Sequence, residues 1–164
     1  MTMTVFASLL WMATLPAMPS ADGELERLRE ATRFAVAKME PVRLETLTLD
    51  DSTRKHLEAT RRRIFESAAR IEEFVPAARK KPSLELSFAL LNEAKVVDDL
   101  LEDMAEGLAT AKMEKVKEQD PIVVWFRGAS ESSIRVLGAA LALEKVLQTQ
   151  LGVADARLAT CGAK

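Results

Sequence analysis

Apolar residues recur every three or four positions along most of this chain, and that spacing is the period of an α-helix. The most regular run lies in residues 83–118, with spacings of 4-3-4-3-4-3: Leu90, Ala94, Val97, Leu101, Met104, Leu108 and Ala111. A second stripe in the same segment comprises Leu84, Phe88, Leu91 and Leu100. A helix with two apolar stripes has two surfaces to bury, so we expect this helix to contact two neighbours.

A first helix is expected over residues 22–39. Asp22 is a suitable N-cap, because its carboxylate can accept an amide hydrogen of the first turn. Pro41 is expected to stop the helix, and residues 41–49 are predicted to form an extended connector. The residues on its apolar face are Leu25, Leu28, Thr32, Ala35 and Met39.

A second helix is expected over residues 51–78, after three candidate capping residues at 50–52. Pro76 should kink or end it, because proline lacks the amide hydrogen that a helix interior needs. Its seam contains one charged residue among apolar and small ones: Leu57, Arg61, Ile64, Ala68, Ile71, Val75 and Ala78.

The fourth helix is expected over residues 121–151. Asp120-Pro121 predicts its start, since aspartate caps helices and proline fits the first helical position. Glycine and serine at 128–133 predict a break or restart, and Gly152 predicts the C-terminal end. Residues 153–164 are then expected to form a frayed tail.

Four amphipathic helices with short links predict an all-α fold, an antiparallel four-helix bundle. Heptad-like seams suit the crossing angle of ~20° found in such bundles. We place the bundle domain at residues 22–152. No repeat of about 34 residues is visible, so a helical solenoid is not expected.

The first 21 residues contain no charged side chain, whereas all 48 Asp, Glu, Lys and Arg residues follow them. Residues 5–15 form an apolar run of signal-peptide length, followed by two prolines and small residues. We therefore interpret residues 1–21 as a signal peptide that is cleaved after Ala17 or Ala21. The run is shorter than the ~20 residues of a membrane span, so no stable span is expected in the mature chain, which we place in the periplasm or outside the cell.

Two other interpretations of residues 1–21 remain open, because no Lys or Arg precedes Arg27. The segment could be a core helix. Alternatively, translation could begin at Met12 or Met18, which would leave a cytoplasmic protein.

The chemistry that the chain can support is limited by its composition. The chain has no Tyr, one His (His56) and one Cys (Cys161), fewer ligands than common zinc sites or di-iron bundles need. We expect His56 to be a surface residue, and Cys161 to be inert in the tail or to pair between chains. The net charge of −2 lacks the basic excess of a nucleic-acid-binding domain. We expect no catalytic residue, cofactor or metal site.

Charge is segregated between the second and third helices. Residues 54–81 hold nine Lys or Arg against four Glu, and residues 84–118 hold nine Asp or Glu against four Lys. If the two helices pair about a turn near 80–82, facing residues have numbers that sum to about 160–164. The two patches would then neutralise each other, although either could instead bind a charged partner.

Arg61 is unusual because it occupies a seam position. Its stem can lie along apolar surface while its guanidinium reaches the rim, and we expect it to pair with Asp98, Asp99 or Glu102. These four residues are the candidates for an interaction or for fixing the helix register. A cation site among the acidic residues is disfavoured, because a straight helix cannot wrap an ion as a loop does.

The sequence favours an exported, non-enzymatic helical bundle that acts through protein–protein contacts or self-association. One alternative is a sensor or carrier bundle for a small apolar ligand, with space near the small residues Ala94, Ala105, Gly107, Ala109 and Ala111. Another is a cytoplasmic helical adaptor translated from Met12 or Met18. An enzyme that uses Asp and Glu alone is the least favoured.

Overall fold

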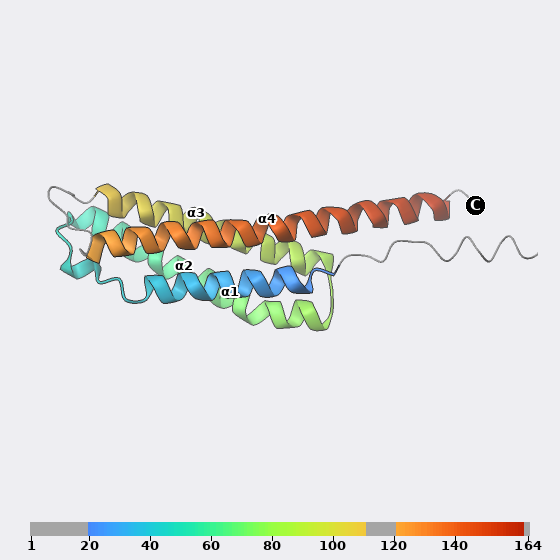
Figure 1. Cartoon of the computed structure of the whole chain (residues 1–164), viewed down its shortest axis with the longest axis horizontal. Coiled ribbons are helices and arrows are strands. Elements are labelled where there is room, and N and C mark those ends of the chain that lie inside the picture. Colours follow the sequence, from blue (N-terminus) through green and yellow to red (C-terminus); the bar gives the residue numbers. More distant parts are fainter. Residues whose placement is uncertain (1–19, 111–120, 163–164) are drawn as a thin grey trace, which may run out of the picture.

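The computed structural model describes residues 20–110 and 121–162, and within them the chain is an all-α four-helix bundle (Figure 1). Residues 1–19 of the expected signal segment, and Ala111, lie outside the described residues. The helices are α1 (Asp22–Met39), α2 (Asp51–Lys80), α3 (Leu84–Thr110) and α4 (Pro121–Gly162), with a short 3-10 helix, η2 (Leu44–Thr46), between α1 and α2. No strand occurs in these residues.

Successive helices run in opposite directions, so the bundle has up-down-up-down topology (Figure 1). α3 packs against α2 and α4, which confirms the expectation that it contacts two neighbours. α1 closes the ring by packing against α4 and α2. α2 and α4 are therefore diagonal to each other, and each presents its outward face on an opposite side of the bundle.

The core contains the apolar positions that the helical spacing places on one face of each helix. Burial of one large aliphatic side chain contributes about 1.5–3 kcal/mol, so the stability of the bundle rests on this set. The largest fully buried side chains are Leu25, Leu28, Met39, Leu44, Leu57, Ile64, Ile71, Leu90, Leu101, Met104, Leu108 and Leu143.

Helix starts follow the capping signals closely. The Asp50 carboxylate accepts hydrogen bonds from the amide and the hydroxyl of Thr53, at 2.9 and 2.6 Å. These bonds lower the pKa of Asp50, the hydroxyl contributing most. At α1 the prediction was wrong by one position: Asp22 is already helical, and its amide donates to the Ser20 hydroxyl at 3.2 Å.

Pro76 does not end α2, which continues to Lys80. The ring lies on the exposed face, while Val75 and Ala78 beside it are buried. Helical bonding continues after the proline, and the amide of Lys81 donates to the carbonyl of Ala77 at 2.9 Å. Burial on both sides of the proline therefore outweighs the helix bond that Pro76 cannot make.

α4 is longer than expected and does not break at residues 128–133. The hydroxyl of Ser132 donates to the Gly128 carbonyl at 2.6 Å, and that of Ser133 donates to Asp98 at 2.7 Å. Both buried hydroxyls are thus satisfied without interrupting the helix. The helix also passes through Gly152 to Gly162 and extends beyond the other three helices (Figure 1).

The connector between α1 and α2 is anchored rather than simply extended. It contains η2, and both Val42 and Leu44 are buried in the core.

None of the described helices combines the length and the hydropathy that crossing a membrane requires.

Candidate functional site

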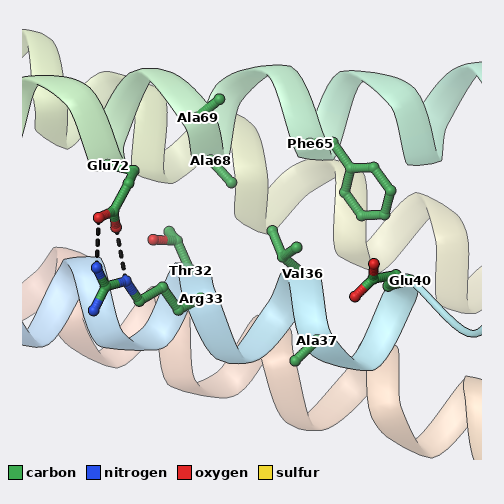
Figure 2. Close-up of a pocket in the computed structure, with 9 residues that line it drawn as sticks. All are labelled: Thr32, Arg33, Val36, Ala37, Glu40, Phe65, Ala68, Ala69 and Glu72. Atoms are coloured by element: carbon green, nitrogen blue, oxygen red, sulfur yellow. Dashed lines mark hydrogen bonds and ion pairs between the residues drawn. The ribbon is translucent and has the colours of Figure 1, made fainter.

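An open groove of about 450 Å³ lies between α1 and α2 (Figure 2). Four of its lining residues come from α2 and the others from the C-terminal half of α1 and the residue after it. They are Thr32, Arg33, Val36, Ala37, Glu40, Phe65, Ala68, Ala69 and Glu72.

The middle of the groove is apolar because its residues are small or lack polar groups. Ala68 is buried, Val36 and Phe65 are half-buried, and Ala37 and Ala69 are exposed. Three alanines leave space that larger side chains would fill. The groove therefore offers an apolar surface that the bundle itself leaves uncovered.

Thr32 brings no unsatisfied hydrogen-bonding group to the groove. Its buried hydroxyl donates within α1, to the carbonyls of Leu28 at 3.1 Å and Arg29 at 3.0 Å. A bound group would therefore not need to supply a hydrogen-bond partner there. Recognition in the centre of the groove would rest on apolar contact.

The ends of the groove carry charge. At one end Arg33 donates to Glu72 through Nε at 2.8 Å and through Nη2 at 2.5 Å (Figure 2). At the other end lies Glu40, which is exposed. An occupant thus meets an Arg–Glu pair at one end and a carboxylate about two helical turns away.

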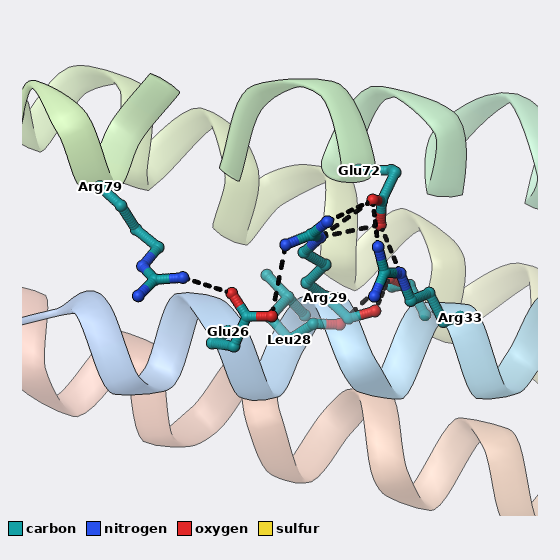
Figure 3. Close-up of polar contacts among 7 residues, drawn as sticks. Glu26, Leu28, Arg29, Arg33, Glu72 and Arg79 are labelled. Carbon is teal, nitrogen blue, oxygen red and sulfur yellow. Dashed lines mark hydrogen bonds and ion pairs between the residues drawn. The ribbon is translucent and has the colours of Figure 1, made fainter. Parts of the chain in front are cut away.

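The Arg33–Glu72 pair belongs to a ladder of charges that joins α1 to α2 (Figure 3). Glu72 also accepts from Arg29, at 2.7 Å from Nη2 and 3.0 Å from Nε. Arg29 contacts Glu26 at 3.4 Å, and Glu26 contacts Arg79 at 2.6 Å. Three arginines and two glutamates alternate, so each carboxylate lies between two cations.

The ladder shifts the protonation equilibria of its members. Hydrogen bonds from Arg29 and then from Arg33 lower the pKa of Glu72 from 4.5 to about 2. The bond to Glu72 in turn raises the pKa of Arg29. Glu72 therefore stays ionised well into the acidic range and keeps this end of the groove charged.

The structure does not bring Arg61 to the acidic residues expected to pair with it. The Arg61 guanidinium donates to the carbonyl of Val42 in the connector. Asp98 faces α4, where it is buried and accepts from Ser133, while Asp99 and Glu102 are exposed. The predicted pairing is wrong, because the seam position of Arg61 lies beside the connector and not beside α3.

The predicted register of α2 and α3 is nevertheless observed. Arg70 pairs with Glu93 at 2.9 Å, and Thr60 donates to Asp103 at 3.0 Å. The residue numbers of each pair sum to 163, inside the expected range. The charge patches meet only in part, because the end of α2 contributes Arg79 and Glu72 to contacts with α1.

The remaining titratable residues singled out in the sequence contact different parts of the bundle. His56 pairs with Asp103 at 3.0 Å, and both side chains are exposed. No three His, Cys, Asp or Glu residues within 20–110 and 121–162 are placed to hold a metal ion. The acidic residues of α3 point to different neighbours, since Asp98 bonds to α4 and Asp103 to α2.

Comparison with protein-family models, characterised proteins and solved structures gives no match. The function must therefore be argued from the chain's own surfaces. Sequence reasoning missed the groove and its ladder. The signals present were the i,i+4 arginines Arg29 and Arg33 and the paired small residues Ala68 and Ala69, but neither indicates which helix lies opposite.

Proposed function

We propose that this chain is an exported, non-enzymatic helical bundle that binds a partner protein in the groove between α1 and α2. The observation that carries the proposal is the groove itself, which is open, apolar in the middle and charged at both ends. An open apolar groove is a common docking site for an amphipathic helix, whose anchors recur at i, i+3, i+4 and i+7.

The dimensions suit a short helical segment. Thr32 and Glu40 are eight residue steps apart, or about 12 Å along the helix axis. Two turns of a partner helix cover that length. Ala37, Ala68 and Ala69 allow such a helix to approach closely, while Val36 and Phe65 supply contact area.

Charge defines the orientation of the bound helix. A basic residue of the partner would lie near Glu40, and an acidic one near Arg33. Electrostatic complementarity of this kind selects partners and orientation more than it adds affinity.

Photo-crosslinking in the native host tests the proposal. A p-benzoylphenylalanine at Ala69, in the groove, is expected to yield one discrete protein adduct. The matched control carries the same group at Ala89, which is exposed on α3. Ala37→Glu, across the groove, should abolish the adduct at position 69 without changing the circular dichroism spectrum. Equal adducts at both positions, or none at position 69, would contradict the proposal.

A small apolar carboxylate is the second candidate for the groove. The volume of the groove lies within the ~300–1,000 Å³ of ligand pockets, and Arg33 at one end of the groove could pair with the carboxylate. The small residues of α3 do not support an internal cavity there: Ala94 is fully buried, and Gly107 lies against Leu57. A fluorescent fatty acid should bind to the protein saturably. Arg33→Gln should weaken its binding, whereas the control Arg27→Gln should not.

Export is part of the same proposal, and the start of α1 favours one of the two cleavage positions. The Ser20 hydroxyl accepts from the Asp22 amide, and the Ala21 carbonyl accepts from Leu25 at 2.9 Å. Cleavage after Ala17 keeps both groups, whereas cleavage after Ala21 removes both and places a positive amine at a helix N-terminus, where the dipole disfavours it.

Intact-mass analysis of protein from the native host separates these possibilities. A chain beginning at residue 18 supports export with cleavage after Ala17. Full-length protein, or a cytoplasmic product that starts at Met12, would contradict it. Because a start at Met18 gives a chain of the same length, the cell fraction that contains the product must be determined as well.

A further inference from the structure

The outward face of α4 carries large apolar side chains that no described part of the chain covers. Ile134 is 72% exposed, Leu141 54% and Leu137 37%. They lie at i, i+3 and i+7, which places them on one stripe of the helix. Gly138 beside them has open space around it.

The projecting end of α4 carries a second apolar group. Leu147 is the last fully buried residue among the α4 side chains that the structure describes, and Gln150 lies at the end of the bundle with Pro82 and Ser83. Twelve further residues, about 18 Å of helix, extend past that end. On them Leu151 is 39% and Leu158 71% exposed. The bundle therefore leaves both of these apolar side chains exposed to solvent.

The two groups belong to one heptad pattern. Its positions alternate by three and four residues from 134 to 158, which is the spacing of a coiled-coil seam. Polar residues occupy the middle of the seam, and apolar residues occupy both ends, where Asp155 is the one charged seam residue between Leu151 and Leu158. In order, the seam is Ile134, Leu137, Leu141, Glu144, Gln148, Leu151, Asp155 and Leu158.

We propose that a second copy of this chain covers the seam, with the two α4 helices packed antiparallel about a two-fold axis near residue 146. In that register Ile134 contacts the partner's Leu158, and Leu141 contacts the partner's Leu151. Each projecting end thereby lies on the exposed α4 face of the other bundle. The symmetry repeats every contact, as a two-fold interface requires.

Charge selects the antiparallel arrangement over the parallel one. Near the axis Glu144, which also pairs with Lys95 of α3 at 3.0 Å, faces the uncharged Gln148 of the other copy. A parallel pair would instead set Glu144 against Glu144 and Asp155 against Asp155. Like charges facing each other across a seam disfavour that partner arrangement.

The dimer leaves the α1–α2 groove free. α4 packs against α1 and α3 but not α2, so its outward face lies on the far side of the bundle from α2. Dimer formation and the proposed partner binding thus use different surfaces. Failure of either one says nothing about the other.

Sedimentation equilibrium of the full chain, together with substitutions at both ends of the seam, tests the dimer. The wild-type protein is expected to have twice the chain mass. Leu158→Glu and Ile134→Glu should each yield a monomer with an unchanged circular dichroism spectrum. Ala156→Glu, exposed on the same projecting end but off the seam, should remain dimeric. A wild-type monomer at every concentration, or a dimer that tolerates Leu158→Glu, would overturn the proposal.

Disulfide trapping tests the orientation. In a Cys161→Ser background, a single cysteine at Lys145 lies near the two-fold axis and is expected to crosslink two chains on oxidation. A single cysteine at Leu158 should not, because its counterpart lies at the other end of the seam. Crosslinking at 158 would show a parallel pair and overturn the antiparallel one.

Discussion

The two helix pairs of this bundle are held together in different ways. α3 and α4 pack closely along an apolar interface, and a buried Asp98–Ser133 hydrogen bond crosses it. α1 and α2 pack more loosely, joined at one end by five alternating charges and separated farther along by the groove. Apolar packing resists change, whereas partly exposed ion pairs are individually weak. The α1–α2 side is therefore the part of the bundle where the proposed partner would bind at small cost to stability.

The largest contrast between the two pairs is expected from truncating apolar side chains. Leu101→Ala, at a fully buried position of α3, should reduce the free energy of unfolding by about 2–5 kcal/mol, because it creates a cavity that the close packing cannot fill. Val36→Ala, in the groove, should cost only about 1–2 kcal/mol, since two carbons are lost from a half-buried site. Urea denaturation measures both. Equal costs would show that the groove is closed in solution.

The contrast also shows what the sequence could predict. The three-and-four spacing identified all four helices and the α2–α3 register, because a helical period determines which residues share a face. The same spacing could not place Arg61, since its long side chain bonds to the Val42 carbonyl in a connector with no period. The length of α4 was missed because Gly152 is exposed to open space, where nothing forces the helix to end.

The groove was beyond prediction for a related reason. It results from side-chain volume that is missing where two helices face each other, at Ala37 on α1 and at Ala68 and Ala69 on α2. A small residue on a single helix is equally compatible with close packing, as Gly107 shows against Leu57. Only the relative position of the helices decides between these outcomes.

An intermediate effect is expected at the polar contact within the tight pair. Ser133→Ala removes the donor to Asp98 and leaves a buried carboxylate short of a hydrogen bond, which should cost about 1–3 kcal/mol. Ser130→Ala, one turn earlier and less buried, is the control and should cost less. The two substitutions can be compared by thermal and urea denaturation. If Ser133→Ala lowers the free energy of unfolding no more than the control does, water must reach Asp98 and replace the lost hydrogen bond.

The smallest effect is expected in the charge ladder, and its dependence on pH identifies it. Glu72 remains partly exposed, so Glu72→Gln should cost no more than about 1 kcal/mol at neutral pH. The folded-state pKa of Glu72 is lowered from 4.5 to about 2, so the folded state favours the ionised form. Its contribution is complete above about pH 5 and is lost as the pH falls from 4.5 towards 2.

The difference between wild type and Glu72→Gln should therefore shrink over that acidic interval, and added salt should reduce it at neutral pH. Glu73→Gln is the matched control, since Glu73 is exposed and has no ion pair within the described residues. It should show neither dependence. If the difference in the free energy of unfolding between wild type and Glu72→Gln persists at pH 2, the Glu72 side chain stabilises the α1–α2 contact by packing. Packing, and not charge, would then hold the two helices together at this end of the groove.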